Sequence, residues 1–219
     1  SRHTAESAGG FLLKAFIFAN GDFDFPREIE DPDLIIAANG GAHHCLRLGI
    51  NPDYVIGDLD SLSEADRSIL KEIGAQIIKF PENKDFTDLE LALIHAKRLG
   101  VSEVLIFGAL GKRWDQTIAN LLVGAGDLEM RIHLLDGHQK ISYLRSGESL
   151  AITGRSGDIL SLIPLCANAT GITTRGLKYP LKDETLVFGA TRGVSNVMVD
   201  EQAEVTLKQG TLLCIISPK

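Results

Sequence analysis

The sequence predicts an α/β fold, with a parallel, doubly wound (Rossmann-like) N-terminal domain and a smaller all-β C-terminal sandwich or barrel. Up to about residue 136, short apolar runs alternate with longer amphipathic runs, as in β-α units. After Gly137 the helical period stops, and short alternating runs are separated by turn residues, as in antiparallel sheets. The 219 residues suffice for one sizeable unit and a smaller partner.

The candidate strands of the first half are short, nearly continuous apolar runs of the kind that is buried in parallel sheets. They lie at residues 12–19, 34–38, 54–56, 76–80, 104–107 and 131–135. Runs with helical spacing lie between them, at residues 42–48, 64–73, 89–99 and 116–125. We therefore expect a parallel sheet with helices on both faces.

The second half contains candidate antiparallel strands at residues 148–153, 159–164, 197–200, 203–208 and 212–217. We expect a catalytic α/β domain over residues 11–136 and a β-rich domain over residues 137–219. Residues 1–10 are small and polar, and we interpret them as a disordered tail or an added remnant.

Composition narrows the possible partners. A net charge of −7, without runs of Lys or Arg, argues against a nucleic-acid surface. The apolar runs are too short to cross a bilayer. Three widely spaced cysteines, Cys45, Cys166 and Cys214, fit a reducing compartment, so we expect a cytoplasmic protein that binds neither nucleic acid nor membrane.

Polar and glycine-rich turns follow several of the candidate strands. In open α/β sheets, ligands bind beyond the carboxyl ends of the strands, so these turns are the candidate site. The turns lie at residues 38–42, 57–61, 83–88 and 108–116. If the strands are parallel, all of these turns lie on one edge of the sheet.

Each turn also has a purely structural interpretation. Asp58 and Asp60 are suited to a turn or to capping the next helix. Thr87 forms a capping box with Glu90, three residues later. The paired glycines at 40 and 41 either supply a turn or let a phosphate approach a helix N-terminus.

Taken together, the turns bring acidic and basic side chains to one crevice. Clustered carboxylates repel one another unless a cation neutralises them, and hard oxygen ligands suit Mg²⁺. The neighbouring cations Lys84, Lys112 and Arg113 suit phosphate oxygens. The acidic residues are Asp58, Asp60, Asp85, Asp88 and Asp115.

The motifs of several other enzyme classes are missing from the sequence. It contains no P-loop, no dinucleotide-binding glycine fingerprint and no serine-hydrolase elbow. Phosphoryl-type transfer needs mainly positioning and neutralisation of charge, which an Asp cluster with Mg²⁺ supplies. The sequence therefore favours a metal and polyphosphate site.

In this order, the turns resemble the signature of the thiamine pyrophosphokinases. The family carries Asp-Gly-Gly, Gly-Asp-x-Asp-Ser, Lys-Asp-x-Thr-Asp and Gly-Gly-Arg-x-Asp-His-x-x-x-Asn. Here the corresponding residues are 39–41, 57–61, 84–88 and 111–120, and residues 176–181 and 193–196 look like the family's thiamine-site segments. The resemblance implies a homodimer with active sites between subunits, and a reaction in which the hydroxyl of thiamine attacks the β-phosphorus of ATP and AMP leaves.

The resemblance also assigns roles to individual residues. It implies catalytic roles for Asp58, Asp60, Asp88 and Asp115, with the first three of these also binding Mg²⁺. Thiamine would be bound by Ser195 and Asn196. The residues implied for ATP and phosphate binding are Asn39, Gly40, Gly41, Lys84, Asp85, Thr87, Arg113 and Asn120.

The chain departs from the family pattern at two positions. Asn39 stands where the family usually has Asp, and Gln116 where it often has His, so a charge and a titratable group are missing. These departures leave open a catalytically weakened regulator that binds nucleotide or thiamine. A pyrophosphokinase for another hydroxymethyl acceptor, such as a pterin, is a further alternative.

Overall fold

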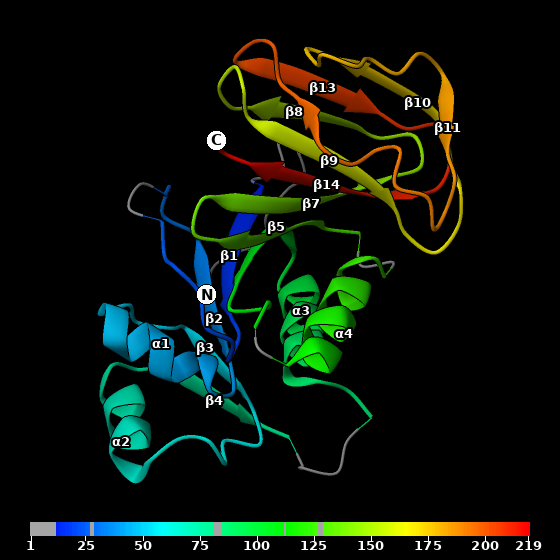
Figure 1. Cartoon of the computed structure of the whole chain (residues 1–219). Coiled ribbons are helices and arrows are strands. Elements are labelled where there is room, and N and C mark those ends of the chain that lie inside the picture. Colours follow the sequence, from blue (N-terminus) through cyan, green and yellow to red (C-terminus); the bar gives the residue numbers. More distant parts are fainter. Residues whose placement is uncertain (1–11, 27–28, 81–84, 112, 127–128) are drawn as a thin grey trace, which may run out of the picture.

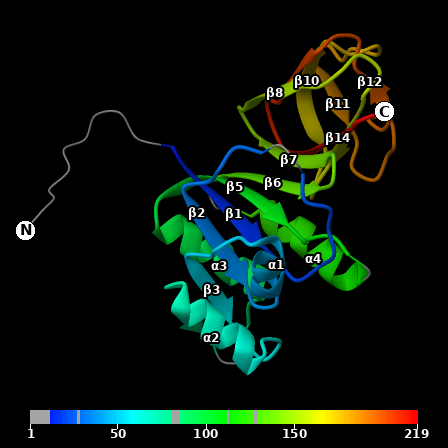
Figure 2. The same cartoon turned by 90° about the vertical axis from the view of Figure 1, so that its left-hand side faces the viewer.

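The computed structural model describes residues 12–26, 29–80, 85–111, 113–126 and 129–219 (Figure 1). The expected tail at residues 1–10 lies outside this part of the chain. One long mixed sheet runs through both halves, and a smaller antiparallel sheet packs over its C-terminal half (Figure 2).

The first half of the long sheet is parallel, in the order β4-β3-β2-β1-β5-β6. Successive side chains point to opposite faces of this sheet and are apolar on both faces. This explains why the strands are nearly continuous apolar runs in the sequence. The strands are β1 (Leu13–Phe18), β2 (Leu34–Ala38), β3 (Tyr54–Gly57), β4 (Gln76–Lys79), β5 (Val101–Phe107) and β6 (Arg131–Asp136).

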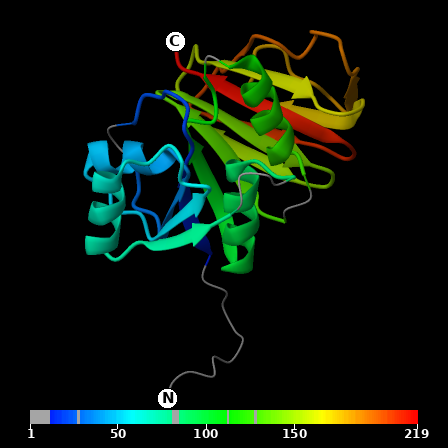
Figure 3. The same ribbon diagram turned by 90° about the horizontal axis from the view of Figure 1, so that it is seen from below.

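Helices cover both faces of this parallel half (Figures 1 and 3). α1 (Gly41–Leu48) and α2 (Glu64–Glu72) pack on one face, against Phe16 and Phe18. α3 (Asp88–Arg98) packs on the other face, against Ala15 and Ile17, with α4 (Trp114–Gly124) beside it. The two sets of β1 side chains alternate, so each face buries its own apolar core.

The second half is antiparallel and continues the same sheet. β7 (Gln139–Arg145) pairs with β6 in a tight hairpin, and the order continues as β7-β14-β9-β12. The smaller sheet has the order β11-β10-β13-β8 and encloses a separate apolar core with the larger one. The remaining strands are β8 (Ser149–Thr153), β9 (Ile159–Pro164), β10 (Ala169–Arg175), β11 (Glu184–Leu186), β12 (Asn196–Val197), β13 (Gln202–Thr206) and β14 (Thr211–Ser217).

The expected fold class, an α/β half followed by a β-rich half, is confirmed in outline. The predictions for β2 and β9 have the observed bounds, whereas β7, β10 and β11 were not predicted. The expected domain division at residues 136 and 137 falls in the hairpin between β6 and β7. The division remains a proposal, within a sheet that runs through both halves.

No helix in the described part of the chain is long and apolar enough to cross a membrane. The cysteines are free thiols, with Cys45 and Cys214 buried and Cys166 exposed. Burial raises the pKa of the Cys45 and Cys214 thiols to about 12, which keeps them protonated at neutral pH.

Candidate active site

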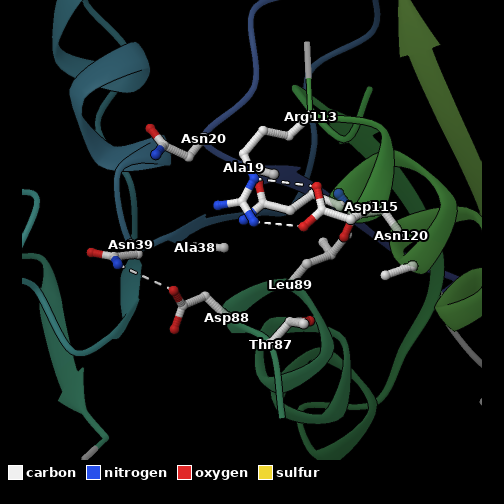
Figure 4. Close-up of a pocket in the computed structure, with 12 residues that line it drawn as sticks. Ala19, Asn20, Ala38, Asn39, Thr87, Asp88, Leu89, Arg113, Asp115 and Asn120 are labelled. Carbon is white, nitrogen blue, oxygen red and sulfur yellow. Dashed lines mark hydrogen bonds and ion pairs between the residues drawn. The ribbon is translucent and has the colours of Figure 1, made fainter. Parts of the chain in front are cut away.

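A cavity of about 480 Å³ opens at the carboxyl ends of β1 and β2, beside the first turns of α3 and α4 (Figure 4). The strand order reverses here, because β2 lies on one side of β1 and β5 on the other. Open α/β sheets bind ligands at such points. The lining residues are Ala19, Asn20, Ala38, Asn39, Thr87, Asp88, Leu89, Arg113, Asp115, Gln116, Ala119 and Asn120.

Asn39 joins two of the predicted carboxylates. Its Nδ2 donates hydrogen bonds to Asp58 Oδ1 (2.8 Å) and to Asp88 Oδ2 (3.1 Å). Ser61 Oγ donates to Asn39 Oδ1 (2.8 Å), and the Asn39 backbone N–H donates to the Ile56 carbonyl (2.7 Å). Residues 39, 58 and 88, which are far apart in the sequence, thus form one hydrogen-bonded group.

The backbone around this group adopts left-handed conformations. Asn39 has φ 45° and Leu59 has φ 68°, which are uncommon for residues other than glycine and concentrate at functional sites. Gly57 has φ 150°, and a Cβ on it would lie 2.9 Å from Asn39 Cβ and 3.1 Å from Asp88 Oδ1. Only glycine at position 57 therefore allows Asn39 and Asp88 to approach this closely.

Asp60 belongs to the same turn but points outward. Its backbone N–H donates to Asp58 Oδ1 (3.1 Å), whereas its own side chain is exposed. Arg67 Nη2 donates to the Leu59 carbonyl (2.6 Å) and fixes the turn from behind. The turn therefore holds Asp58 against Asn39 and leaves Asp60 exposed, and neither residue is among those that line the cavity.

Arg113 and Asp115 form a two-pronged ion pair on the opposite wall (Figure 4). Arg113 Nε and Nη2 donate to the two carboxylate oxygens of Asp115, at 3.2 and 2.5 Å. These hydrogen bonds from Arg113 lower the pKa of the Asp115 carboxyl, and the Gln116 backbone N–H lowers it further. Both side chains are exposed, so Arg113 can exchange this partner for a phosphate oxygen.

The first turns of α3 and α4 converge on the cavity. Thr87 is the N-cap of α3 and accepts a hydrogen bond from the Glu90 backbone N–H (3.2 Å), which is one half of the predicted capping box. Asn120 Nδ2 donates to the Ala109 carbonyl (2.7 Å) and so ties α4 to the loop after β5. Helix N-termini carry partial positive charge, which favours anions in this cavity.

The glycine pair was predicted to receive phosphate, but Gly40 and Gly41 are buried and do not line the cavity. A Cβ on Gly41 would lie 1.8 Å from the Phe18 carbonyl oxygen, and one on Gly40 would lie 2.2 Å from Asn20 Oδ1. Both glycines therefore allow α1 to pack closely on β1 and on the loop that follows β1.

The remaining predicted residues of the cavity are only partly brought together. Asp85 is exposed before α3, and Lys84 and Lys112 lie outside the described residues. Within the described part of the chain, no group of three or more His, Cys, Asp or Glu side chains is close enough to hold a metal. Of the predicted carboxylates, Asp88 and Asp115 line opposite walls of the cavity, Asp58 is paired with Asp88 through Asn39, and Asp60 is exposed.

The residues predicted to bind thiamine lie in the antiparallel half. Asn196 is in β12, where its amide bonds the backbone N–H (3.1 Å) and carbonyl (2.7 Å) of Tyr179. Ser195 is exposed, has φ 62° and donates its backbone N–H to Ser161 Oγ (3.0 Å). Strand β12 lies five strands from β5, on the order of 25 Å measured across the sheet.

Asn20 and Ser61 also belong to the site, although neither was predicted to have a role there. Asn20 lines the cavity directly after β1, so the rule that selected the other turns would also have selected it. Ser61 was part of the quoted motif, but its bond to Asn39 becomes visible only in the structure.

The chain matches the models of one known protein family over most of its length. Residues 25–134 match the family described as thiamin pyrophosphokinase, catalytic domain, and residues 148–212 match the vitamin B1 binding domain of the same family. The chain belongs to the thiamin pyrophosphokinase family. The family predicted from the sequence is thus confirmed, and with it the prediction that the chain is an enzyme of the thiamine diphosphokinase type.

Individual relatives span nearly the whole chain. The thiamine pyrophosphokinase of Bacillus subtilis is 28% identical over 190 residues, covering 86% of this chain and 89% of the relative. Thiamine pyrophosphokinase 1 of Oryza sativa is 28% identical over 200 residues, covering 86% and 72%. The crystal structure of the Bacillus subtilis protein superposes with a TM-score of 0.82 at 26% identity, covering 94% of this chain and 99% of that one.

Proposed function

We propose that this chain transfers a diphosphate group from ATP to the hydroxyl of thiamine, with AMP as the second product. The observation that carries the proposal is the cavity in which Asn39 and Asp88 face Arg113 and Asp115, with Asp58 bonded to Asn39 from outside the lining, in a chain of the thiamin pyrophosphokinase family. Phosphoryl-type transfer depends chiefly on holding phosphates in line and neutralising their charge. An arginine, two helix N-termini and a carboxylate pair provide those functions.

Mg²⁺ is the metal that this site would hold. Asp58 Oδ1 and Asp88 Oδ2 both accept hydrogen bonds from a single atom, the Asn39 amide nitrogen, so the two carboxylates lie next to each other. Mg²⁺ commonly binds through one or two carboxylates, with water and substrate phosphates as the other ligands, so the pair fits it. Bound Mg²⁺ would neutralise the negative charge of the phosphate oxygens. Asp60, exposed in the same turn as Asp58, would be a third acidic group for the metal.

The residues on the opposite wall would bind the polyphosphate chain of ATP. Arg113 would turn one of its N–H groups from Asp115 to a phosphate oxygen, and the hydrogen bond that remains to Asp115 would keep the guanidinium oriented. Thr87 would act by capping the first turn of α3, and Asn120 by tying α4 to the loop after β5 at the Ala109 carbonyl. Asp85, Gly40 and Gly41 would have only a supporting role, and Lys84, outside the described residues, is proposed to bind phosphate as the family resemblance implies.

We also propose a homodimer in which the two subunits share each active site. The cavity is lined by residues 19–120, whereas Ser195 and Asn196 lie in the antiparallel half of the same chain. Two apolar surfaces support the proposal. Trp114, Ile118 and Leu122 form an exposed stripe on α4 beside the cavity, and the surface near Ser195 exposes Tyr179, Phe188 and Val194. Such surfaces mark protein interfaces.

A complementation experiment tests the shared site. Asp88→Asn should inactivate the cavity and Asn196→Ala the thiamine segment, so each homodimer has two damaged sites. In a mixed dimer, one site would combine both intact halves and activity would return. No recovery after mixing, with dimers present by size-exclusion chromatography, would argue that each chain builds its own site.

We also propose a more specific fold class and a cellular compartment for this chain. The strand order, which reverses beside β1 with helices on both faces, supports a doubly wound, Rossmann-like class for residues 11–136. Free thiols at Cys45, Cys166 and Cys214 support a reducing compartment such as the cytoplasm.

The deciding experiment measures AMP release from ATP, with and without thiamine and Mg²⁺, and identifies the product by mass. Asp88→Asn should lower the rate about 10²- to 10⁴-fold, because transition-state charge loses its support. Asp31→Asn, an exposed carboxylate before β2, is the matched control. Binding of thiamine without AMP release would favour the regulator suggested by Asn39. Release of AMP with a pterin instead of thiamine would change the acceptor.

A further inference from the structure

Asn39 is bonded to its surroundings through every polar group of its side chain. An amide carries two N–H donors and one carbonyl acceptor. The two donors face Asp58 and Asp88, and the acceptor faces the hydroxyl of Ser61. The reverse orientation would place the carbonyl oxygen against two carboxylates, so the surroundings themselves select this orientation.

The backbone conformation also favours Asn39 at this position, between Asp58 and Asp88. Its φ of 45° lies in the left-handed region, which Asn tolerates better than most residues. Gly57, without a Cβ, opens the space that Asn39 and Asp88 occupy. A strained turn and a close approach are thus both maintained around one amide.

We propose that Asn39 is a positioning residue that holds the carboxylates of Asp58 and Asp88 together when no metal is bound. This inference rests on the proposed function, in which that pair binds Mg²⁺. An Asp at position 39 would instead bring a third carboxylate, which has no hydrogen to donate to the other two. Such a site needs a cation to relieve repulsion, whereas the amide of Asn39 donates one hydrogen bond to each carboxylate.

The consequence is a site that is formed before Mg²⁺ arrives and that binds it less tightly. The amide removes one negative charge from the ligand set, and a metal must displace its two hydrogen bonds to reach the carboxylates. The fold of this chain should therefore depend little on Mg²⁺. An acid at position 39 should make both the fold and the carboxylate pair depend on the metal.

The test measures the midpoint of thermal unfolding (Tm) for the wild type and for Asn39→Asp, in EDTA and across a Mg²⁺ titration without substrates. We expect Asn39→Asp to lower the Tm in EDTA by about 5 °C, and Mg²⁺ to restore most of this loss. The wild-type Tm should move little between the two conditions. Asn51→Asp, an exposed position with the same change in charge, controls for the greater net charge of the variant.

A second variant separates the hydrogen bonds from the added charge. Ser61→Ala removes the donor that orients the Asn39 amide, so the Tm in EDTA should fall without becoming more sensitive to Mg²⁺. Calorimetric titration of Mg²⁺ into the protein should show at least tenfold tighter binding for Asn39→Asp than for the wild type.

The outcomes distinguish this inference from the proposed function. If Asn39→Asp and Asn51→Asp have equal Tm values in EDTA, the amide does not hold the pair and the inference is wrong. If Asn39→Asp loses stability but Mg²⁺ neither binds nor restores it, the bridging role stands and the metal assignment of the proposed function fails. A wild type that unfolds in EDTA and is rescued by Mg²⁺ would also contradict the inference.

Discussion

His133 in β6 should make the free energy of unfolding fall in mild acid. Its ring is almost fully buried, with Nδ1 2.7 Å from Ser142 Oγ and Nε2 3.6 Å from Glu103 Oε1. The Glu103 carboxylate favours the protonated ring, but burial has the larger effect and lowers the pKa of His133 from 6.5 to about 3. Nearby positive charges lower it further, from Lys140, Arg131 and Lys14.

The size of the effect follows from proton linkage. Above about pH 6.5 the imidazole is neutral in both states, and its burial carries no proton-linked cost. Below that pH the imidazole is protonated in the unfolded chain, whereas in the folded protein it stays neutral until about pH 3. The free energy of unfolding therefore falls as the pH falls. This residue alone should make the free energy of unfolding about 2 kcal/mol lower at pH 5 than at pH 7.5.

Urea unfolding at pH 7.5 and pH 5.0 measures this loss for the wild type and for His133→Gln. Gln keeps a polar partner for Ser142 but cannot titrate, so the variant should lose about 2 kcal/mol less over the same interval. His138→Gln, at an exposed histidine in the neighbouring hairpin, should behave like the wild type. Equal losses in the wild type and His133→Gln would mean that water or Glu103 lets the buried ring take up its proton, and would refute the reasoning.

Three further changes test the site and its supports. Arg113→Met should raise the KM for ATP roughly 10- to 100-fold in steady-state assays and leave the Tm unchanged, because the exposed side chain contributes little to folding. Tyr143→Phe leaves a carbonyl of α4 without its 2.7 Å partner and should lower the free energy of unfolding by about 1–3 kcal/mol in urea. Gly41→Ala would place a carbon 1.8 Å from the Phe18 carbonyl oxygen and should cost at least about 2 kcal/mol, whereas Gly111→Ala, with its nearest atom at 3.7 Å, should cost less.

The parallel half could be predicted from the sequence because its strands are buried on both faces. A doubly buried strand such as β2, with the sequence LIIAA, is apolar at every position, and its end is marked by the polar turn at Asn39. Since parallel strands end on one edge, the sequence also places Asp58 and Asp88 at the same edge. The strands and the shared position of these two residues thus follow from local sequence and from the rule that parallel strands end on one edge.

The contacts within the site could not be predicted in the same way. Asn39 and Asp88 are separated by 49 residues, and they meet because α3 packs over β2 and β3. Within the turn at residues 57–61, Asp58 points inward and Asp60 outward, as set by the left-handed backbone at Leu59. Sequence spacing does not reveal such a conformation in a residue other than glycine.

Strand β7, with the sequence QKISYLR, was missed because its charged residues resemble those of an exposed segment. In the structure, Arg145 is partly buried beneath the end of α4. Its Nη2 donates to the carbonyls of Gly124 (3.0 Å) and Gly126 (3.2 Å), and its Nη1 donates to that of Met130 (3.2 Å). A cation at a helix C-terminus satisfies carbonyls that have no partner within the helix and interacts favourably with the helix dipole.

These contacts link the two halves of the molecule through α4. The C-terminal end of α4 is held by Tyr143 and Arg145 of the antiparallel half, and its N-terminal turn presents Arg113 and Asp115 to the cavity. A shift at one end of a rigid helix moves the other end, so β7 helps to set the distance between this wall and the Asp58 and Asp88 pair. A chain cut at the β6–β7 hairpin would lose these bonds, so the cavity in the parallel half depends on side chains from the antiparallel half.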